Sequence, residues 1–250
     1  MPDETATHMA DFWDARAREN ANYFVDNRLD YNDGDEARFW REGETDLSRM
    51  LASVGAEIAP DDVVLDLGCG VGRLTRAAAA RSAHVHGIDV SAEMLVRARG
   101  NLAQCSNVTF HLGDGTTLDP IADASVDAVI SLVVFQHIPD PAVTLGYVRE
   151  IGRVLSPRGW AAFQVSNDPS IHASGNPTPS RLKVLLGRAP SGQRDPAWRG
   201  SAVSLEALRG AVADGGMRVT ALVGEGSQYC VVRTVRDAKP NQKIPRLRNT

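Results

Sequence analysis

The sequence predicts an α/β fold: a doubly wound, seven-stranded and mostly parallel sheet with a helical N-terminal cap. Strand and helix patterns alternate from residue 60 onward, which is typical of a parallel sheet covered by helices on both faces. A glycine-rich turn over residues 68–72 follows the first strand pattern. The last two strand patterns are joined by Gly224, Glu225 and Gly226, which is typical of a hairpin, so we expect the final strand to be antiparallel.

The alternating pattern assigns the elements in order. Strands are expected at about 63–67, 84–89, 107–111, 126–132 and 159–166, followed by 217–223 and 227–235. Helices are expected at about 72–82, 91–103, 141–155 and 205–214. Ser91 can cap the second of these helices, and Glu93 in its first turn complements the helix dipole.

Composition limits the function classes. At 250 residues, with 43% hydrophobic and 23% charged residues, the chain fits one domain with appendages. No run approaches the roughly 20 apolar residues of a membrane span, and the N-terminus lacks a signal-peptide pattern, so we expect a cytoplasmic protein. The net charge of −4 argues against nucleic-acid binding. Cys69, Cys105 and Cys230 are too few and too far apart for a disulfide framework or a zinc site.

The chain divides into four parts by composition. Residues 1–58 are helical in pattern and hold half of the Phe, Trp and Tyr residues, so they predict a cap over a pocket, with a plain docking segment as the alternative. Residues 59–236 form the sheet domain. Residues 167–203, rich in Pro, Gly, Ser and Arg, interrupt it and are typical of a lid. Residues 237–250 are a basic tail that we expect to be flexible.

The glycine-rich turn indicates a ligand site. A strand, a glycine turn and a helix N-terminus bring backbone N–H groups and the helix dipole to one polar ligand. Glycines stand at Gly68, Gly70 and Gly72, whereas the dinucleotide fingerprint would need one at position 73, which is Arg73. A purely structural turn remains the alternative.

Three carboxylates sharpen this prediction. Asp66, Asp89 and Asp114 follow or end three strand patterns, and the carboxyl ends of parallel strands meet at one edge of a sheet. Asp89 is spaced to accept both hydroxyls of a ribose, and Asp114 can accept an adenine amine. The sequence therefore predicts a nucleoside site.

The motifs VLDLGCGVGRLTR, GIDVSAEML, GDGTTL and VDAVISLVVFQHIPDP resemble those of class I S-adenosylmethionine-dependent methyltransferases in order and spacing over residues 60–166. This resemblance implies the Rossmann-like methyltransferase fold and S-adenosylmethionine as cofactor, with S-adenosylhomocysteine as product. It implies that the three glycines flank the methionine part and that Asp66 orients it. The implied cofactor-binding set is Asp66, Gly68, Gly70, Gly72, Asp89, Met94, Asp114, Gly115 and Leu132.

The predicted function is methyl transfer to an oxygen or nitrogen atom of a small-molecule acceptor, such as a specialised metabolite. Two alternatives stay open: a nucleoside-binding protein without methyl transfer (an NAD oxidoreductase or a sensor), and a protein methyltransferase. Positioning supplies most of the rate in such a displacement, so a strong catalytic signature is not needed. The sequence contains no metal-ligand spacing, and the His84/His86 pair is interpreted as structural.

Two features bear on the acceptor. His137 follows the fourth strand and is the candidate catalytic residue: it is either a general base or a residue that orders its loop. The segment after Ser166 has a positive bias that would attract an anionic acceptor, with a solvated surface loop as the alternative. The charges of this segment are Arg181, Lys183, Arg188, Arg194 and Arg199 against Asp168 and Asp195.

Overall fold

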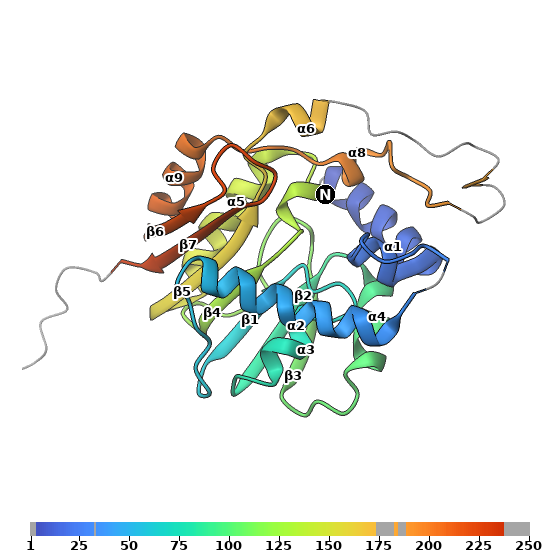
Figure 1. Ribbon diagram of the computed structural model, residues 1–250. Coiled ribbons are helices and arrows are strands. Elements are labelled where there is room, and N and C mark those ends of the chain that lie inside the picture. The colour runs from blue at the N-terminus through green and yellow to red at the C-terminus, as the bar shows by residue number, and fades with distance from the viewer. Residues whose placement is uncertain (1–3, 33, 174–182, 185–188, 238–250) are drawn as a thin grey trace, which may run out of the picture.

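The computed structural model describes residues 4–32, 34–173, 183–184 and 189–237. Two helices, α1 (Glu4–Val25) and α2 (Glu36–Ser53), precede the sheet. The sheet domain then runs β1 (Val63–Leu67), α3 (Arg73–Ala79), β2 (His84–Asp89), α4 (Ala92–Asn101), β3 (Val108–Leu112), β4 (Val126–Ser131), η1 (Phe135–His137), α5 (Pro141–Val154), β5 (Leu155–Val165), α6 (Pro169–Ala173), α8 (Pro196–Arg199), α9 (Leu205–Asp214), β6 (Met217–Val223) and β7 (Cys230–Arg236). Figure 1 shows the sheet at the centre of these elements.

The seven strands form one sheet in the order β3-β2-β1-β4-β5-β7-β6. β1 pairs in parallel with β2 and with β4 on its two sides, so the order of the strands reverses at β1. β7 pairs antiparallel with both β5 and β6. The predicted mostly parallel sheet with an antiparallel last strand is confirmed, and the switch point lies where β1 and β4 end side by side.

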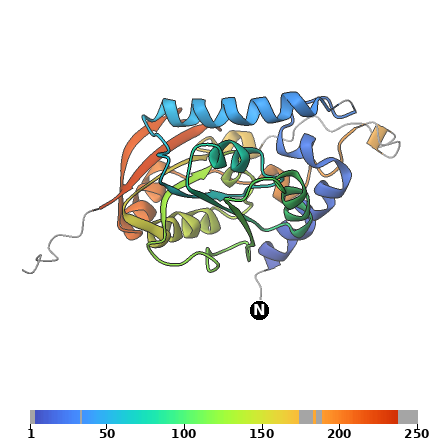
Figure 2. The ribbon, with the colours of Figure 1, turned by 90° about the horizontal axis from the view of Figure 1, so that it is seen from below.

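The two faces of the sheet are covered by different helices (Figure 2). On one face, Leu47 and Met50 of α2 and Leu74 of α3 pack with Val64 and Ile130 of the sheet. On the other face, α5 and α9 cover the sheet, and their buried residues join a second cluster with β1, β4 and β5. Alternate residues of β1 enter opposite clusters, as the period of a strand requires. No helix among the described residues is long and apolar enough to cross a membrane.

The predicted bounds are confirmed at β1, β2, α9 and β6, and the Ser91 cap of α4 is present: its hydroxyl accepts from Met94 N. The fifth strand was predicted too short. Val126 pairs with Leu155 but Ala128 pairs with Trp160, so β5 begins four residues early and accommodates a bulge. The connection between β6 and β7 spans residues 224–229 and is longer than the predicted glycine turn. Residues 238–250, most of the predicted tail, lie outside the described residues.

Candidate active site

A cavity lies at the carboxyl edge of the parallel strands. Its walls come from the ends of β1 and β2, the loop after β3, the loop after β4 and the helices α1, α4 and α5. It is lined by Met9, Trp13, Phe24, Val25, Asp66, Leu67, Gly68, Cys69, Gly70, Arg73, Leu74, Ile88, Asp89, Val90, Met94, Gly113, Gly115, Leu132, Val133, Val134, His137, Ile138 and Tyr147. Of the ten predicted site residues, only Gly72 and Asp114 are outside this lining. We call this space the first cavity.

The glycine turn forms the floor of the first cavity. Gly68 has a φ of 74°, and a Cβ at this position would lie 2.4 Å from a methyl carbon of Val134. Only glycine combines this backbone conformation with such a close approach. The N–H groups of Gly68 and Cys69 both donate to the carbonyl oxygen of Ile88, over 2.8 and 3.0 Å. The turn is therefore fixed to the end of β2, with its backbone facing the cavity.

Asp89 holds the turn from the other side. One carboxylate oxygen accepts from Gly70 N at 2.8 Å, and the other accepts from Ser91 N at 2.9 Å. Burial raises the pKa of Asp89, although these backbone donors favour its ionised form. Each oxygen keeps a further lone pair for a ligand. The carboxylate can therefore accept two more hydrogen bonds at the end of β2.

Asp66 is the second carboxylate at the cavity wall. It is 2% exposed, and one of its oxygens accepts from the hydroxyl of Thr75 at 2.6 Å. Burial raises its pKa to about 6, and the nearby charge of Asp89 adds to the shift. An ionised Asp66 is thus costly in the free protein, and a cation bound in the cavity would stabilise it.

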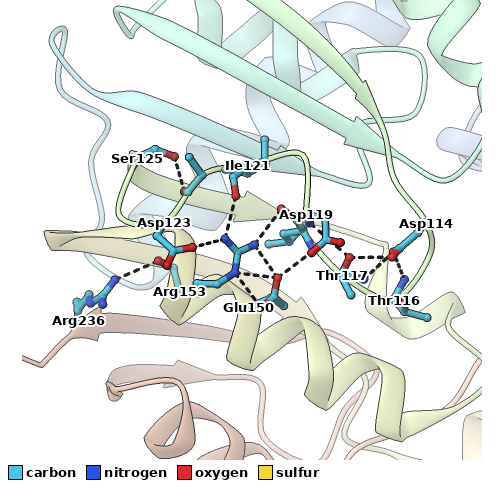
Figure 3. Close-up of polar contacts among 12 residues, drawn as sticks. Asp114, Thr116, Thr117, Asp119, Ile121, Asp123, Ser125, Glu150, Arg153 and Arg236 are labelled. Carbon is cyan, nitrogen blue, oxygen red and sulfur yellow. Dashed lines mark hydrogen bonds and ion pairs between the residues drawn. The ribbon is translucent and has the colours of Figure 1, made fainter.

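Asp114 and Gly72 lie beside the first cavity and do not line it. The carboxylate of Asp114 accepts from the N–H groups of Thr116 and Thr117 and from the Thr117 hydroxyl (Figure 3). These hydrogen bonds lower its pKa, although burial opposes them. A Cβ on Gly72 would meet Leu102 at 2.8 Å, so this glycine also serves packing. The predicted ligand roles of both residues stay predictions.

The loop that carries Asp114 is fixed to α5 (Figure 3). Arg153 donates to the carbonyl oxygens of Leu118 and Ile121, and Glu150 accepts from Leu118 N at 3.1 Å. Arg153 also pairs with Glu150 and Asp123. These contacts bring the loop between β3 and β4 to the cavity edge without a helix in the connection.

Helix α1 forms the roof of the first cavity. Its residues Met9, Trp13, Phe24 and Val25 line the cavity. The helix is kinked at Asn20, where φ is −164° and the side-chain oxygen accepts from Tyr23 N. The kink divides the helix into two segments, and both contribute residues to the roof.

An acidic side chain fastens α1 to the sheet domain. One Asp14 oxygen accepts from the Ser91 hydroxyl at 2.6 Å and from Glu93 N at 3.1 Å. These contacts fix the first segment of the helix at the N-terminus of α4, next to Asp89.

A second cavity adjoins the first and is larger, about 410 Å³ against about 120 Å³. The two share lining residues from the loop after β4, namely Leu132, Val133 and His137, as well as Phe24, Val25 and Arg73. The remaining lining of the second cavity is Asp26, Asn27, Arg28, Asp46, Gln136, Gln164, Ile171, Trp198, Arg199, Gln228 and Tyr229. Val133 has a φ of 61°, which is an outlier for a β-branched residue and indicates local strain where the cavities meet.

Two arginines and two aspartates form an ion-pair network between the cavities. Arg73 donates to Asp46 at 2.7 Å, and Arg28 donates to both Asp46 and Asp26. The side chains of Arg73 and Asp26 are 4% and 3% exposed. Arg73 Nε is buried without a hydrogen-bond partner among the described residues. The Arg73 side chain lines both cavities, so a buried donor without a partner lies on a residue at their boundary.

His137 ends a directional chain of hydrogen bonds. Val133 N donates to Gln164 Oε1, so the Gln164 amide nitrogen must face Gln136 Oε1, to which it donates at 2.6 Å. The Gln136 amide nitrogen then lies 3.2 Å from His137 Nε2, which can only accept from it. His137 Nδ1 donates to the carbonyl oxygen of Trp198 at 2.7 Å. Burial lowers the pKa of this imidazole to about 4, so it is neutral at pH 7.

The segment after β5 contributes Ile171, Trp198 and Arg199 to the second cavity, and Arg199 is the one predicted charge of this segment, among the described residues, that lines it. Arg199 lines the second cavity and donates to the carbonyl oxygens of His172 and Ala173 at the end of α6. Arg181 and Arg188 lie outside the described residues. Lys183 and Arg194 do not line either cavity. The segment also contacts α1, because the hydroxyl and N–H of Ser191 donate to Glu19.

Sequence patterns missed several residues of this region. In the sequence, Arg73 is marked only by its position, where the dinucleotide fingerprint would need a glycine. No local pattern links Gln136 to Gln164. His111 contacts His86 at 3.0 Å from the neighbouring strand, so the predicted pair has a third histidine beside it. Among the described residues, no group of three or more His, Cys, Asp or Glu side chains is arranged to hold a metal ion.

Comparison with known proteins identifies relatives of the sheet domain. Residues 65–163 match the family model described as "Methyltransferase domain". The chain is 35% identical over 141 residues to an arsenite methyltransferase of Halobacterium salinarum, covering 54% of this chain and 35% of that one. It is 34% identical over 105 residues to a ubiquinone biosynthesis O-methyltransferase of Thiobacillus denitrificans, covering 42% and 44%. The chain thus spans well under two thirds of the length of these curated relatives.

Solved structures share the whole fold. The magnesium protoporphyrin IX methyltransferase of Synechocystis PCC 6803, solved with bound S-adenosylhomocysteine, superposes with a TM-score of 0.61 at 19% identity. The match covers 94% of this chain and 100% of that one. At this identity, the likeness shows the fold alone.

Proposed function

We propose that this chain, which carries a class I S-adenosylmethionine-dependent methyltransferase domain, transfers a methyl group from S-adenosylmethionine to an oxygen or nitrogen atom of a small-molecule acceptor. One observation carries the proposal. The first cavity, at the carboxyl ends of β1 and β2, shares the lining residues Leu132, Val133 and His137 with a second and larger cavity. A cofactor in the first cavity and an acceptor in the second would meet at this loop.

The residues of the first cavity fit the cofactor. The two available lone pairs of Asp89 suit the hydroxyls of a ribose, and Met94 offers an apolar surface for an adenine. The unpaired Nε of Arg73 suits the carboxylate of the methionine part. The buried Asp66 favours a nearby cation. Gly68, Gly70, Gly115 and Leu132 complete the walls, and we keep Gly72 and Asp114 as predicted ligands at the rim.

Binding and orientation are the main contributions of the protein to the reaction. The cofactor supplies an electrophilic methyl group on a positively charged sulfur. Holding a nucleophile in line with such a carbon can contribute roughly 7–11 kcal/mol to lowering the barrier. The roof residues Trp13 and Phe24 would cover a cofactor bound in the first cavity. The Gln164 contact to Val133 N holds the loop at which the two substrates would meet.

The second cavity is proposed as the acceptor site, bounded by residues 24–28 and Asp46 of the predicted cap and by Ile171, Trp198 and Arg199 of the predicted lid. Ion pairs among Arg28, Arg73, Asp26 and Asp46 balance one another on one wall. Arg199 of the lid adds a further positive charge. An anionic small molecule is therefore the acceptor that we propose for this site.

Calorimetry distinguishes methyl transfer from the other nucleoside chemistries. The chain is titrated with S-adenosylmethionine, with S-adenosylhomocysteine and with NAD. We expect both sulfur compounds to bind and NAD to bind at least tenfold more weakly. Tighter binding of NAD would overturn the proposal and favour an oxidoreductase or a sensor.

The acceptor is sought with a donor that carries an isotopically labelled methyl group. The chain is incubated with metabolite pools and with the acceptors that the names of its relatives indicate, arsenite and a ubiquinone precursor. We expect label in a small molecule. Label confined to protein would instead indicate a protein methyltransferase, and label in no fraction, despite cofactor binding, would contradict enzymatic activity.

A further inference from the structure

We infer that the acceptor enters the second cavity already ionised, as the oxyanion of an organic acid or acidic phenol, and that Arg199 selects it. The inference rests on the proposed function and narrows its substrate class. The transfer would then need no general base, and His137 would be a positioning residue.

The hydrogen bonds of His137 argue against a base at this position. A general base needs a free lone pair aimed at the acceptor, but the Nε2 lone pair of His137 already accepts from Gln136. Its Nδ1 proton is committed to Trp198 O. Gln136 cannot turn away freely because its oxygen accepts from Gln164. The low pKa of the buried imidazole agrees with this geometry, since it makes His137 a weak base at pH 7.

The carboxylates of the second cavity are also engaged. Asp26 accepts from Arg28 through both oxygens at 2.7 Å. Asp46 accepts from Arg28 and Arg73 at 2.6 and 2.7 Å. The bonds from Arg28 and the charge of Arg73 hold the pKa of Asp26 below its ordinary value, although burial opposes them. A carboxylate stabilised as an anion in this way has little tendency to take a proton from an acceptor.

Arg199 is the positive group that remains. Among the described residues, no carboxylate lies within ion-pair distance of its guanidinium, whereas the other two arginines of the cavity are neutralised. The lid segment around it packs directly on η1: a Cβ on Gly200 would overlap the carbonyl oxygen of Gln136. This packing fixes the backbone next to Arg199 beside the loop where the cavities meet. The exposed Arg199 side chain lines the second cavity and donates to the carbonyl oxygens of His172 and Ala173. An oxyanion in the cavity would therefore find an unneutralised cation near the transfer point.

The reaction balances without a proton transfer. A lone pair of the acceptor oxyanion forms the new oxygen–carbon bond as the carbon–sulfur bond breaks, and the electron pair of that bond stays on sulfur. One anion and one sulfonium cation become an uncharged methyl ester or ether and an uncharged thioether. The second cavity then needs to supply only a counter-charge and an orientation, which Arg199 and the fixed loop provide.

The test uses the full chain saturated with S-adenosylhomocysteine and two probes of similar size, benzoate and benzyl alcohol. Calorimetry at pH 7.5 measures the affinity of each. We expect benzoate to bind at least tenfold more tightly than benzyl alcohol, because charged hydrogen bonds contribute roughly 1.5–3 kcal/mol, which is tenfold or more in affinity. Arg199→Gln should abolish the preference, and Arg199→Lys should retain part of it. Arg209→Gln, on the exposed surface of α9, is the matched control and should leave it unchanged.

Three results would overturn the inference: equal affinity for the two probes, binding of neither, or a benzoate preference that survives Arg199→Gln. Because the lid could loosen in the Gln variant, hydrogen exchange of residues 196–203 is compared in the three variants. The inference requires that the benzoate preference follow the positive charge at position 199, which Arg199→Lys keeps. It must not follow the hydrogen-exchange protection of residues 196–203. Failure of S-adenosylhomocysteine to bind at all would instead defeat the proposed function, so the two failures are distinguishable.

Discussion

The two cavities are built in different ways, although they share one loop. The floor and the carboxylates of the first come from residues that are close in sequence, namely the β1–α3 turn and the end of β2. The second collects Arg28, Asp46, Gln164, Arg199 and Tyr229 from five separate segments. A backbone turn can be specified by local sequence, whereas a pocket assembled from distant side chains depends on how the cap and the lid pack. The proposed cofactor site can therefore be predicted from the sequence, whereas the proposed acceptor site depends on the fold.

The largest expected effect comes from replacing Arg73, which is one of the residues that line both cavities. Among the residues that the structure describes, Arg73→Met leaves Asp46 and Asp26 with Arg28 as their only counter-charge in a nearly buried site. Removing one member of a buried ion-pair network lowers the free energy of unfolding by about 3–5 kcal/mol. Denaturant titration measures this change.

The control for Arg73 is Arg41→Met, which removes an exposed arginine 4.0 Å from Asp35. Surface pairs contribute at most about 1 kcal/mol. If the Arg73 variant were no less stable than the Arg41 variant, the network would not hold the cap to the sheet domain.

A smaller effect is expected on the cofactor side. Asp89→Ala removes the acceptor of two backbone donors and, in our proposal, of the ribose hydroxyls. The loss of such charged hydrogen bonds, roughly 1.5–3 kcal/mol, should weaken S-adenosylhomocysteine binding tenfold or more. Calorimetry on the folded variant measures it.

Asp114→Ala makes the comparison sharper. Its carboxylate is occupied by Thr116 and Thr117, so we expect a weaker effect on cofactor affinity than at Asp89. A loss larger than that of Asp89→Ala would mean that the loop opens to present Asp114 to the adenine, as the sequence alone predicts. Unchanged affinity in the Asp89 variant would mean that the nucleoside binds elsewhere.

Asp89 and Asp114 illustrate how much of the site can be predicted from sequence patterns. Alternation of strands and helices predicted the sheet and its reversed strand, because hydrophobic period and turn chemistry are local properties. The bulge in β5 was missed because it depends on pairing with β4, 29 residues away at the Val126↔Leu155 contact. Asp114 follows the correct strand, yet its orientation is decided by a turn with Thr116. The Gln136–Gln164 contact joins η1 to strand β5, and no spacing in the sequence encodes it.

His137 lies where the two cavities meet and gives a test of its role. If it is a positioning residue, His137→Gln should lower turnover of an identified acceptor by less than about tenfold at saturating cofactor, whereas loss of a general base costs 10² to 10⁴ in rate. His137→Ala, which empties the site, should lower stability more than Gln does. A fall in turnover of 10² or more, with intact cofactor binding in both variants, would restore His137 as a base.

The smallest predicted effect is the pH dependence of stability, to which His137 and Asp66 contribute with opposite signs. The His137 imidazole is charged when protonated. Its pKa in the folded chain, about 4, lies below the ordinary value of 6.5 because burial disfavours the charged form. The unfolded chain therefore binds a proton first, and stability is lost as pH falls from about 6.5 towards 4. Asp66 has the opposite sign: its folded pKa of about 6 lies above 3.8, again through burial. The folded chain binds that proton first, so stability is gained as pH falls from about 6 towards 4.

Thermal unfolding of the cofactor-free chain between pH 4.5 and 8 should therefore respond in opposite directions to two neutral substitutions. Asp66→Asn keeps an acceptor for the Thr75 hydroxyl and removes a buried charge, so it should raise Tm above pH 6 by a few degrees, on the order of 2–4 °C per kcal/mol for a chain of this size. The gain should shrink as pH falls towards 4. His137→Gln should instead lower Tm, and this loss relative to the unsubstituted chain should be smallest at acid pH. If Asp66→Asn were destabilised at pH 8, the carboxylate would be stabilised by its surroundings even without a cofactor, and the first cavity would not favour a cation.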